Sequence, residues 1–238
     1  MGIDVPAMID RKNKVISQLT QGIEGLFAAN KINGIAGTGK LVSANKIVVT
    51  RHDGKQEELT AKHIILATGS VPIDIPPTPI NQETIVDSTG ALEFKEVPER
   101  LGVIGAGVIG LELGSVWSRL GSKVTVLEAL DDFLPMVDRQ VAKEAQKILT
   151  KQGLNIQLGA MVTGSKFSKS AKKTVTVEYK DKEGDQKANF DKLIVAVGRK
   201  PYTNELVDSS VAIEFDEQGF IKVNDQCATN VCLLYTSP

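Results

Sequence analysis

Three glycines, at positions 105, 107 and 110, have the spacing that most clearly indicates chemistry. They stand in Leu101-Gly-Val-Ile-Gly-Ala-Gly-Val-Ile-Gly-Leu-Glu-Leu113, which is typical of a short apolar strand, a turn and the opening of a helix. In a GxGxxG turn, Gly105 makes the tight bend, Gly107 lets the backbone approach a pyrophosphate, and Gly110 lets the helix pack close to the strand. The helix N-terminus also offers free N–H groups to phosphates. We therefore predict a dinucleotide site; the alternative is a packing turn without a ligand.

A second apolar strand, Lys123–Glu128, ends in an acid eighteen residues after Gly110. A carboxylate at this place can accept hydrogen bonds from the adenosine ribose and repels a 2′-phosphate. The sequence therefore predicts a preference for NAD over NADP at this site.

The surrounding pattern indicates the elements that must position these residues. Apolar residues at helical spacing predict an amphipathic helix over about 7–31, with Arg11, Lys12, Lys14 and Gln18 facing outward. Alternation and turn residues predict a first hairpin of strands 46–50 and 57–67 and a second of strands 174–180 and 187–197. A helix near 138–152 and a strand at 154–158 complete the expected nucleotide-binding unit.

An internal repeat links the two hairpins. Lys62-His-Ile-Ile-Leu-Ala-Thr-Gly-Ser-Val-Pro72 parallels Lys192-Leu-Ile-Val-Ala-Val-Gly-Arg-Lys-Pro201, because each is an apolar strand that ends in Ala-x-Gly and then Pro. Such a repeat implies two related nucleotide-binding units. Only the second unit has a glycine-rich start in this sequence, so we expect the chain to be a fragment.

Four motifs make a family resemblance specific: residues 67–70, 105–117, 133–141 and 196–201. Over about residues 8–231 the chain resembles the FAD-dependent pyridine nucleotide–disulfide oxidoreductases, and among them the members that oxidise protein-bound dihydrolipoamide. The resemblance implies an α/β fold of two Rossmann-like nucleotide-binding domains, with a complete NAD domain inserted into an incomplete FAD domain. The implied domains are an FAD-binding fragment at 1–75, an NAD-binding domain at 76–204, and an FAD-domain return at 205–238 with an aberrant tail.

The resemblance also implies cofactor contacts. NAD would be held by Gly105, Ala106, Gly107, Val108, Ile109, Gly110, Leu111 and Glu112 together with Glu128, with Val162 near the adenine and Gly198 near the nicotinamide. FAD would contact Gly39, Thr68, Gly69 and Ser70. For Glu112 two interpretations stay open: an acid beside the flavin, as in the family, or a first-turn acid stabilised by the helix dipole.

The activity implied for the whole protein is oxidation of dihydrolipoamide on the lipoyl-bearing acyltransferase of a 2-oxo acid dehydrogenase complex, with hydride passing through FAD to NAD in a homodimer. The redox disulfide and the catalytic histidine of the family have no counterpart here, so we expect this chain to be inactive alone. Two alternatives remain: another NAD(P)-dependent flavoprotein disulfide reductase, and a non-enzymatic NAD-binding module. Glu128, with no arginine just after it, argues against an NADP-linked member.

Composition and isolated residues exclude other classes. A net charge of −1 gives no electrostatic case for nucleic acid, and the apolar runs are too short to span a bilayer, so we expect a cytoplasmic protein, or one of the mitochondrial matrix in a eukaryote. Cys227 and Cys232 have the Cys-x4-Cys spacing of a redox centre, but the nearby sequence offers no general base or basic residue that would activate a thiol, and we interpret the spacing as coincidence. His52 and His63 have no partners at metal-ligand spacing, so no metal site is expected.

Overall fold

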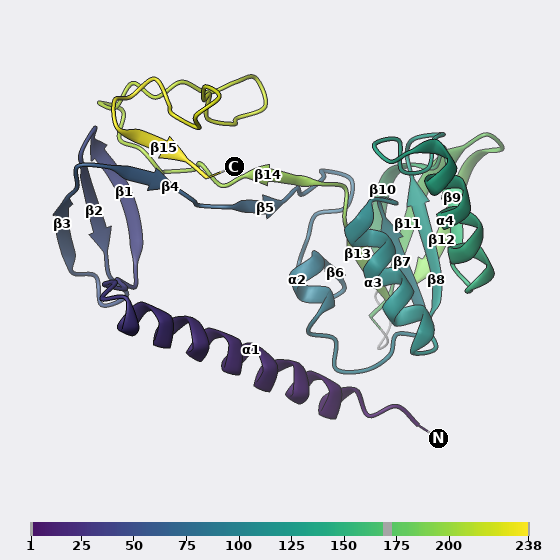
Figure 1. Cartoon of the computed structure of the whole chain (residues 1–238). Helices are drawn as coiled ribbons and strands as arrows, with labels where there is room; N and C mark the ends of the chain where they lie inside the picture. The colour runs from purple at the N-terminus through teal and green to yellow at the C-terminus, as the bar shows by residue number, and fades with distance from the viewer. Residues whose placement is uncertain (1, 169–172, 238) are drawn as a thin grey trace. The chain divides into compact units, whose positions relative to one another are not determined.

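The computed structural model describes residues 2–168 and 173–237, and these form two compact units (Figure 1). The first unit comprises residues up to Gln18 and Pro72–Gly198, and the second comprises Leu19–Val71 and the residues from Arg199 onward. In the part of the chain that is described, no helix has the length and apolar character needed to cross a membrane.

The first unit is built on a five-stranded parallel sheet, which confirms the predicted α/β class. Its strand order is β6-β13-β7-β8-β9. The strands are β6 (Ile85–Val86), β13 (Lys192–Val195), β7 (Arg100–Ile104), β8 (Lys123–Glu128) and β9 (Asn155–Leu158). Because the strands are parallel, the carboxyl ends of β7, β8 and β13 all meet at one edge of the sheet.

Successive side chains along these strands pack into two separate cores, one on each face of the sheet. Val103 and Val126 pack with the helices α3 (Val108–Arg119) and α4 (Arg139–Lys151), whereas Ile104 and Leu127 pack with an antiparallel meander on the opposite face. The meander comprises β10 (Met161–Phe167), β11 (Val175–Asp181) and β12 (Gly184–Phe190) (Figure 1). A short helix, α2 (Ser88–Ala91), follows β6. Trp117 is 2% exposed and its ring lies 5.1 Å from that of Phe94, so it packs in the core of this unit.

The prediction of one strand over 187–197 is wrong, because the chain changes sheets at Asp191. Residues before it form β12 of the meander, and residues after it form β13 of the parallel sheet. Asp191 fixes this change of direction: its carboxylate accepts hydrogen bonds from the backbone N–H of Arg100 at 2.9 Å and from its guanidinium at 3.1 Å. The sequence pattern also missed β10, whose polar composition conceals a strand.

The second unit contains an antiparallel sheet of β1 (Thr38–Ser43), β2 (Lys46–Thr50) and β3 (Gln56–Thr60). The prediction of one strand over 57–67 is wrong, because the chain leaves this sheet after Thr60 and begins a new strand, β4 (Ile64–Leu66). β4 pairs in parallel with β15 (Leu234–Thr236), and Leu234 is fully buried. The segment predicted to be an aberrant tail therefore contributes a strand to the core of this unit.

The internal repeat appears as two equivalent bends in the chain. β4 is followed by Gly69 at φ +69° and by β5 (Ser70–Pro72), and β13 is followed by Gly198 at φ +135° and by β14 (Arg199–Pro201). β5 and β14 form a two-stranded ribbon. The repeated Ala-x-Gly-x-x-Pro segments are thus paired with each other as well as similar in sequence.

The N-terminal helix α1 (Val5–Ala29) confirms the helix predicted from the apolar spacing, but most of its apolar side chains are not buried. Val5 is buried, whereas Leu19 is 66% and Leu26 63% exposed. Lys12, which was expected to face outward, donates to the backbone oxygen of Leu92 at 3.2 Å and forms an ion pair with Glu93. The apolar spacing therefore marks a helix whose C-terminal half has an uncovered apolar face.

Candidate nucleotide-binding site

The glycine turn between β7 and α3 is held by backbone contacts that leave no room for side chains at two positions. Gly105 has φ +101°, and its N–H donates to the oxygen of Leu127 at 2.8 Å. A Cβ added at Gly105 would lie 2.5 Å from the oxygen of Ala196, and one at Gly110 would lie 2.2 Å from the oxygen of Gly105. Both glycines are therefore required by the close packing of β7, α3 and β13.

Gly107 differs, because it is exposed and a Cβ there would meet nothing within 4 Å. It is the N-cap of α3, and among the described residues no side chain caps this end of the helix. The first intrahelical bond to the cap is donated by Leu111, so the N–H groups of the preceding turn remain to donate hydrogen bonds to an outside partner. The open space over Gly107 and the uncapped helix end fit an anionic group such as a pyrophosphate.

Glu128, the last residue of β8, is fixed beside this turn. Its Oε2 accepts a hydrogen bond from the backbone N–H of Ala106 at 2.7 Å, and its Oε1 accepts one from Leu130 at 2.9 Å. Each carboxylate oxygen has a further lone pair, which can accept a hydroxyl donor. The acid predicted from its spacing is therefore held by the same turn in which Gly107 leaves space for a ligand.

The loop after β8 carries two ion pairs. Arg139, the first residue of α4, binds Asp132 in a bidentate manner, with contacts of 3.0 and 3.1 Å. The hydrogen bond and the positive charge of Arg139 lower the pKa of the Asp132 carboxyl. Lys182 lies 3.7 Å from Asp131. The side chains are all more than half exposed.

Glu112 is the one residue of this segment that the structure corrects. α3 begins at Val108, so Glu112 is the fifth helical residue, and the first turn contains no acid. The interpretation as a first-turn acid is therefore wrong, because the dipole effect falls off within that turn. Its side chain is exposed, in contrast to the buried Leu111 and Leu113 on either side.

The remaining residues expected around NAD also belong to the first unit. Val162 lies in β10, is 9% exposed and packs in the core beneath the sheet. Gly198 is exposed, and its oxygen accepts a hydrogen bond from the N–H of Ile73 at 3.1 Å. The segment from Gly105 to Leu111, Glu128 and the end of β13 before Gly198 lie at the carboxyl edge of one sheet.

The residues expected around FAD belong to the second unit but to different sheets. Gly39 is an exposed residue of β1. Thr68, Gly69 and Ser70 form the bend between β4 and β5, where Thr68 Oγ1 donates to the oxygen of Tyr202 at 2.7 Å. The Ser70 hydroxyl oxygen accepts a hydrogen bond from Arg199 Nε at 2.7 Å. The structure therefore groups residues 68–70 and leaves Gly39 on another sheet.

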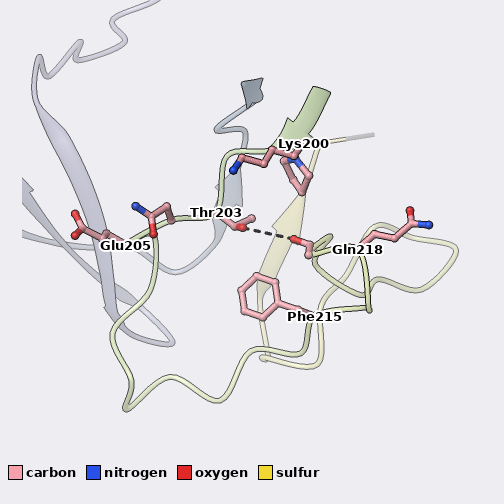
Figure 2. A pocket seen from close by; sticks show the side chains of 8 residues that line it. Lys200, Thr203, Glu205, Phe215 and Gln218 are labelled. Atoms are coloured by element: carbon pink, nitrogen blue, oxygen red, sulfur yellow. Dashed lines mark hydrogen bonds between the residues drawn. The ribbon is translucent and has the colours of Figure 1, made fainter. Parts of the chain in front are cut away.

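Sequence reasoning missed a pocket in the second unit. Figure 2 shows its lining side chains, with Thr203 directed toward the loop that carries Gln218 and with Phe215 below it. The cavity volume is about 430 Å³, and the Thr203 hydroxyl lies 3.5 Å from the oxygen of Gly219. The lining comes from two separate segments, 200–205, which begins in β14, and 215–219. Nothing in the sequence indicates that these two segments come together.

The cysteines and histidines have ordinary surroundings. Cys227 and Cys232 are free thiols, and His63 stacks on Tyr235 with ring centres 6.0 Å apart. Within the described ranges, 2–168 and 173–237, no cluster of three or more acidic, histidine or cysteine side chains could hold a metal ion.

Comparison with known proteins gives concordant results. Residues 3–236 match the family of pyridine nucleotide-disulphide oxidoreductases. The chain is 50% identical to a dihydrolipoyl dehydrogenase of Cupriavidus necator, covering 96% of this chain and 48% of that protein, and 42% identical to a leghemoglobin reductase of Glycine max, covering 98% and 44%. Among solved structures it resembles the HOCl-induced flavoprotein disulfide reductase RclA of Escherichia coli, in its Cu(II) complex, with a TM-score of 0.82 and 31% identity over 96% of this chain and 50% of that one. The chain spans about half the length of the curated relatives it matches.

Proposed function

The chain belongs to the pyridine nucleotide-disulphide oxidoreductase family, and from this premise we propose that it binds NAD(H) at the turn between β7 and α3. One observation carries the proposal: Glu128 is held by the N–H of Ala106 inside a turn whose Gly107 opens onto free space. The acid expected to bind the ribose is thus fixed to the turn that leads into the anion-binding end of α3.

In the proposed complex the pyrophosphate lies against the N–H groups of Gly107–Gly110, and Glu128 accepts hydrogen bonds from the ribose hydroxyls. Ala106, Val108, Ile109, Leu111 and Glu112 complete this segment, with Val162 toward the adenine and Gly198 toward the nicotinamide. The negative charge of Glu128 disfavours a 2′-phosphate, so the site prefers NAD to NADP.

In the whole protein we propose a second, FAD-binding domain to which residues 1–75 and 205–238 contribute, with residues 76–204 as the inserted NAD-binding domain. Gly39, Thr68, Gly69 and Ser70 contact the flavin in this proposal. The exposed glycines and the bend stabilised by Thr68 and Tyr202 are compatible with a ligand that approaches the backbone. Flavin, when bound, supplies the two-electron chemistry between a dithiol and a nicotinamide.

The relatives named above support oxidation of protein-bound dihydrolipoamide as the activity of the whole protein, with NAD as the final acceptor. Its partner is then the lipoyl-bearing acyltransferase of a 2-oxo acid dehydrogenase complex, and the protein works as a homodimer in the cytoplasm or the mitochondrial matrix. The 238-residue chain contributes nucleotide binding to this activity and does not turn over the dithiol alone.

A titration of NADH fluorescence against the unmodified chain and the Gly107→Ala variant tests the proposed site. We expect saturable binding by the unmodified chain. The added methyl group projects into the ligand space and costs about 1–3 kcal/mol by overpacking, so binding to the variant should be about tenfold weaker. Equal affinities would overturn the assignment of the pyrophosphate to this turn.

A further inference from the structure

The loop that follows Glu128 contains two adjacent acids, Asp131 and Asp132, and each of these two is paired with a base. Asp131 and Asp132 follow Glu128 within four residues. Asp132 binds both terminal nitrogens of Arg139, and Asp131 lies 3.7 Å from Lys182. Arg139 and Lys182 therefore lie beside this loop, each in an ion pair with one of its two adjacent acids.

The loop lies on the far side of Glu128 from the glycine turn. The strand order β7-β8-β9 places β9 beyond β8, and the loop is bonded to the end of β9: Gly159 N–H donates to Leu130 O at 3.0 Å, and Ala160 N–H to Glu128 O at 2.8 Å. A Cβ at Gly159 would lie 2.7 Å from Asp131 Oδ1. With the pyrophosphate over β7 and the ribose on Glu128, this is the side on which the adenosine would lie.

On the adenosine side, NAD and NADP differ only by the 2′-phosphate. A guanidinium is the side-chain group best matched to a phosphate, because its planar fork forms two parallel hydrogen bonds. Arg139 carries such a fork, but both of its terminal nitrogens face the Asp132 carboxylate.

We propose that Asp132 is a second determinant of nucleotide specificity, which acts by occupying Arg139 so that its guanidinium does not neutralise a 2′-phosphate. This inference rests on the proposed NAD site. Glu128 acts on the ribose directly, whereas Asp132 acts through Arg139 and is a positioning residue. Discrimination against NADP then has two parts: Glu128 repels the 2′-phosphate, and Arg139, already paired with Asp132, does not attract it.

The ion pair is weak enough for this to be tested by substitution. Arg139 is 66% and Asp132 58% exposed, and pairs of this kind contribute little to folding. Asp132→Asn therefore releases Arg139 without unfolding the protein. A released, exposed guanidinium that meets a doubly charged phosphate at low salt should tighten NADPH binding relative to NADH by about three- to tenfold.

The experiment measures the ratio of the NADPH and NADH dissociation constants for the 238-residue chain at low and high salt. Four proteins are compared: unmodified, Asp132→Asn, Asp132→Asn with Arg139→Gln, and Glu144→Gln. The last is the matched control, because it removes one acid from the same helix as Arg139, where Glu144 pairs with Lys147 at 3.5 Å.

We expect the ratio to fall in Asp132→Asn, to return to the unmodified value in the double variant, and to stay unchanged in Glu144→Gln. A fall in the double variant as large as in Asp132→Asn would overturn the inference, because Arg139 would then play no part. An equal fall in Glu144→Gln would also overturn it, by showing a general charge effect. If the unmodified chain binds NADH normally and Asp132→Asn leaves the ratio unchanged, the inference alone fails; if the unmodified chain binds neither nucleotide, the proposed function fails with it.

Discussion

The carboxylate of Glu128 accepts a hydrogen bond from the backbone N–H of Ala106 at 2.7 Å, across 22 residues of sequence. This bond joins the end of β8 to the glycine turn that follows β7. It fixes the acid before any ligand arrives, so that no side-chain entropy has to be lost when a ribose binds. The turn and the acid therefore form one structural unit.

Substitutions of the three glycines should separate folding from binding. Gly110→Ala places a methyl group 2.2 Å from the oxygen of Gly105, so we expect it to lower the free energy of unfolding by about 3 kcal/mol or more. Gly107 has φ −74°, which any residue can adopt, and it faces open space. Gly107→Ala should therefore change the free energy of unfolding by less than about 0.5 kcal/mol. Urea unfolding followed by circular dichroism measures both, and equal destabilisation would contradict the packing described for this turn.

How far the site could be predicted from sequence depends on the range of the interactions that build it. The glycine spacing and the distance to Glu128 are local patterns, and they pointed to residues that the structure places together at one edge of the sheet. Glu112 was misplaced because a sequence does not mark whether a helix begins at Val108 or later. The bond between Glu128 and Ala106 and the pair of Asp132 with Arg139 depend on loop geometry, which residue spacing does not encode.

The same distinction explains the errors in the fold. Residues 57–67 and 187–197 were each predicted as one strand because neither segment contains a glycine or a proline that would mark a turn, yet each segment changes its strand partners partway along. Asp191 shows why: a single carboxylate that binds Arg100 redirects the strand, and it looks like any other polar residue in sequence. The periodicity of α1 predicted its helix correctly, but burial depends on what packs against it, and Leu19 is 66% exposed.

The ion pair of Asp191 and Arg100 should contribute more to the free energy of unfolding than an exposed ion pair does. The Asp191 side chain is 10% exposed and also accepts the backbone N–H of Arg100, so Asp191→Ala leaves a partly buried donor unsatisfied. We expect a loss of about 1–3 kcal/mol in the free energy of unfolding. The control Glu144→Ala removes an exposed acid from the same unit and should cost less than about 0.5 kcal/mol. Similar losses for the two variants would show that Asp191 is not the anchor of β13.

Flavin should bind weakly to the 238-residue chain. The residues proposed to contact FAD are Gly39 and the bend 68–70, and the described part of the second unit contains no glycine-rich strand–turn–helix that could hold the pyrophosphate of FAD. After incubation with FAD and gel filtration, we expect substoichiometric visible absorbance. A yellow protein with nearly one equivalent of flavin would contradict this prediction.

The chain should also fail to reduce NAD with dihydrolipoamide, even with added FAD. Exchange with a dithiol needs a reactive thiolate and a base to create it. Cys227 and Cys232 are free thiols in a loop and tail of the second unit, and neither histidine is placed beside them by a described contact. Activity that disappears in the Cys227→Ser, Cys232→Ser double variant would show that this Cys-x4-Cys pair is a redox centre.

The most direct test of the central claim is to measure NADH and NADPH dissociation constants for the unmodified chain and for Glu128→Ala. Two charge-assisted hydrogen bonds to the ribose are lost in the variant, so NADH binding should weaken by about ten- to a hundredfold. NADPH binding should weaken much less, because the variant also removes the repulsion of the 2′-phosphate. The account predicts that the unmodified chain prefers NADH and that the preference collapses in Glu128→Ala. Equal affinities for NADH and NADPH in the unmodified chain, or a preference that survives the substitution, would contradict it.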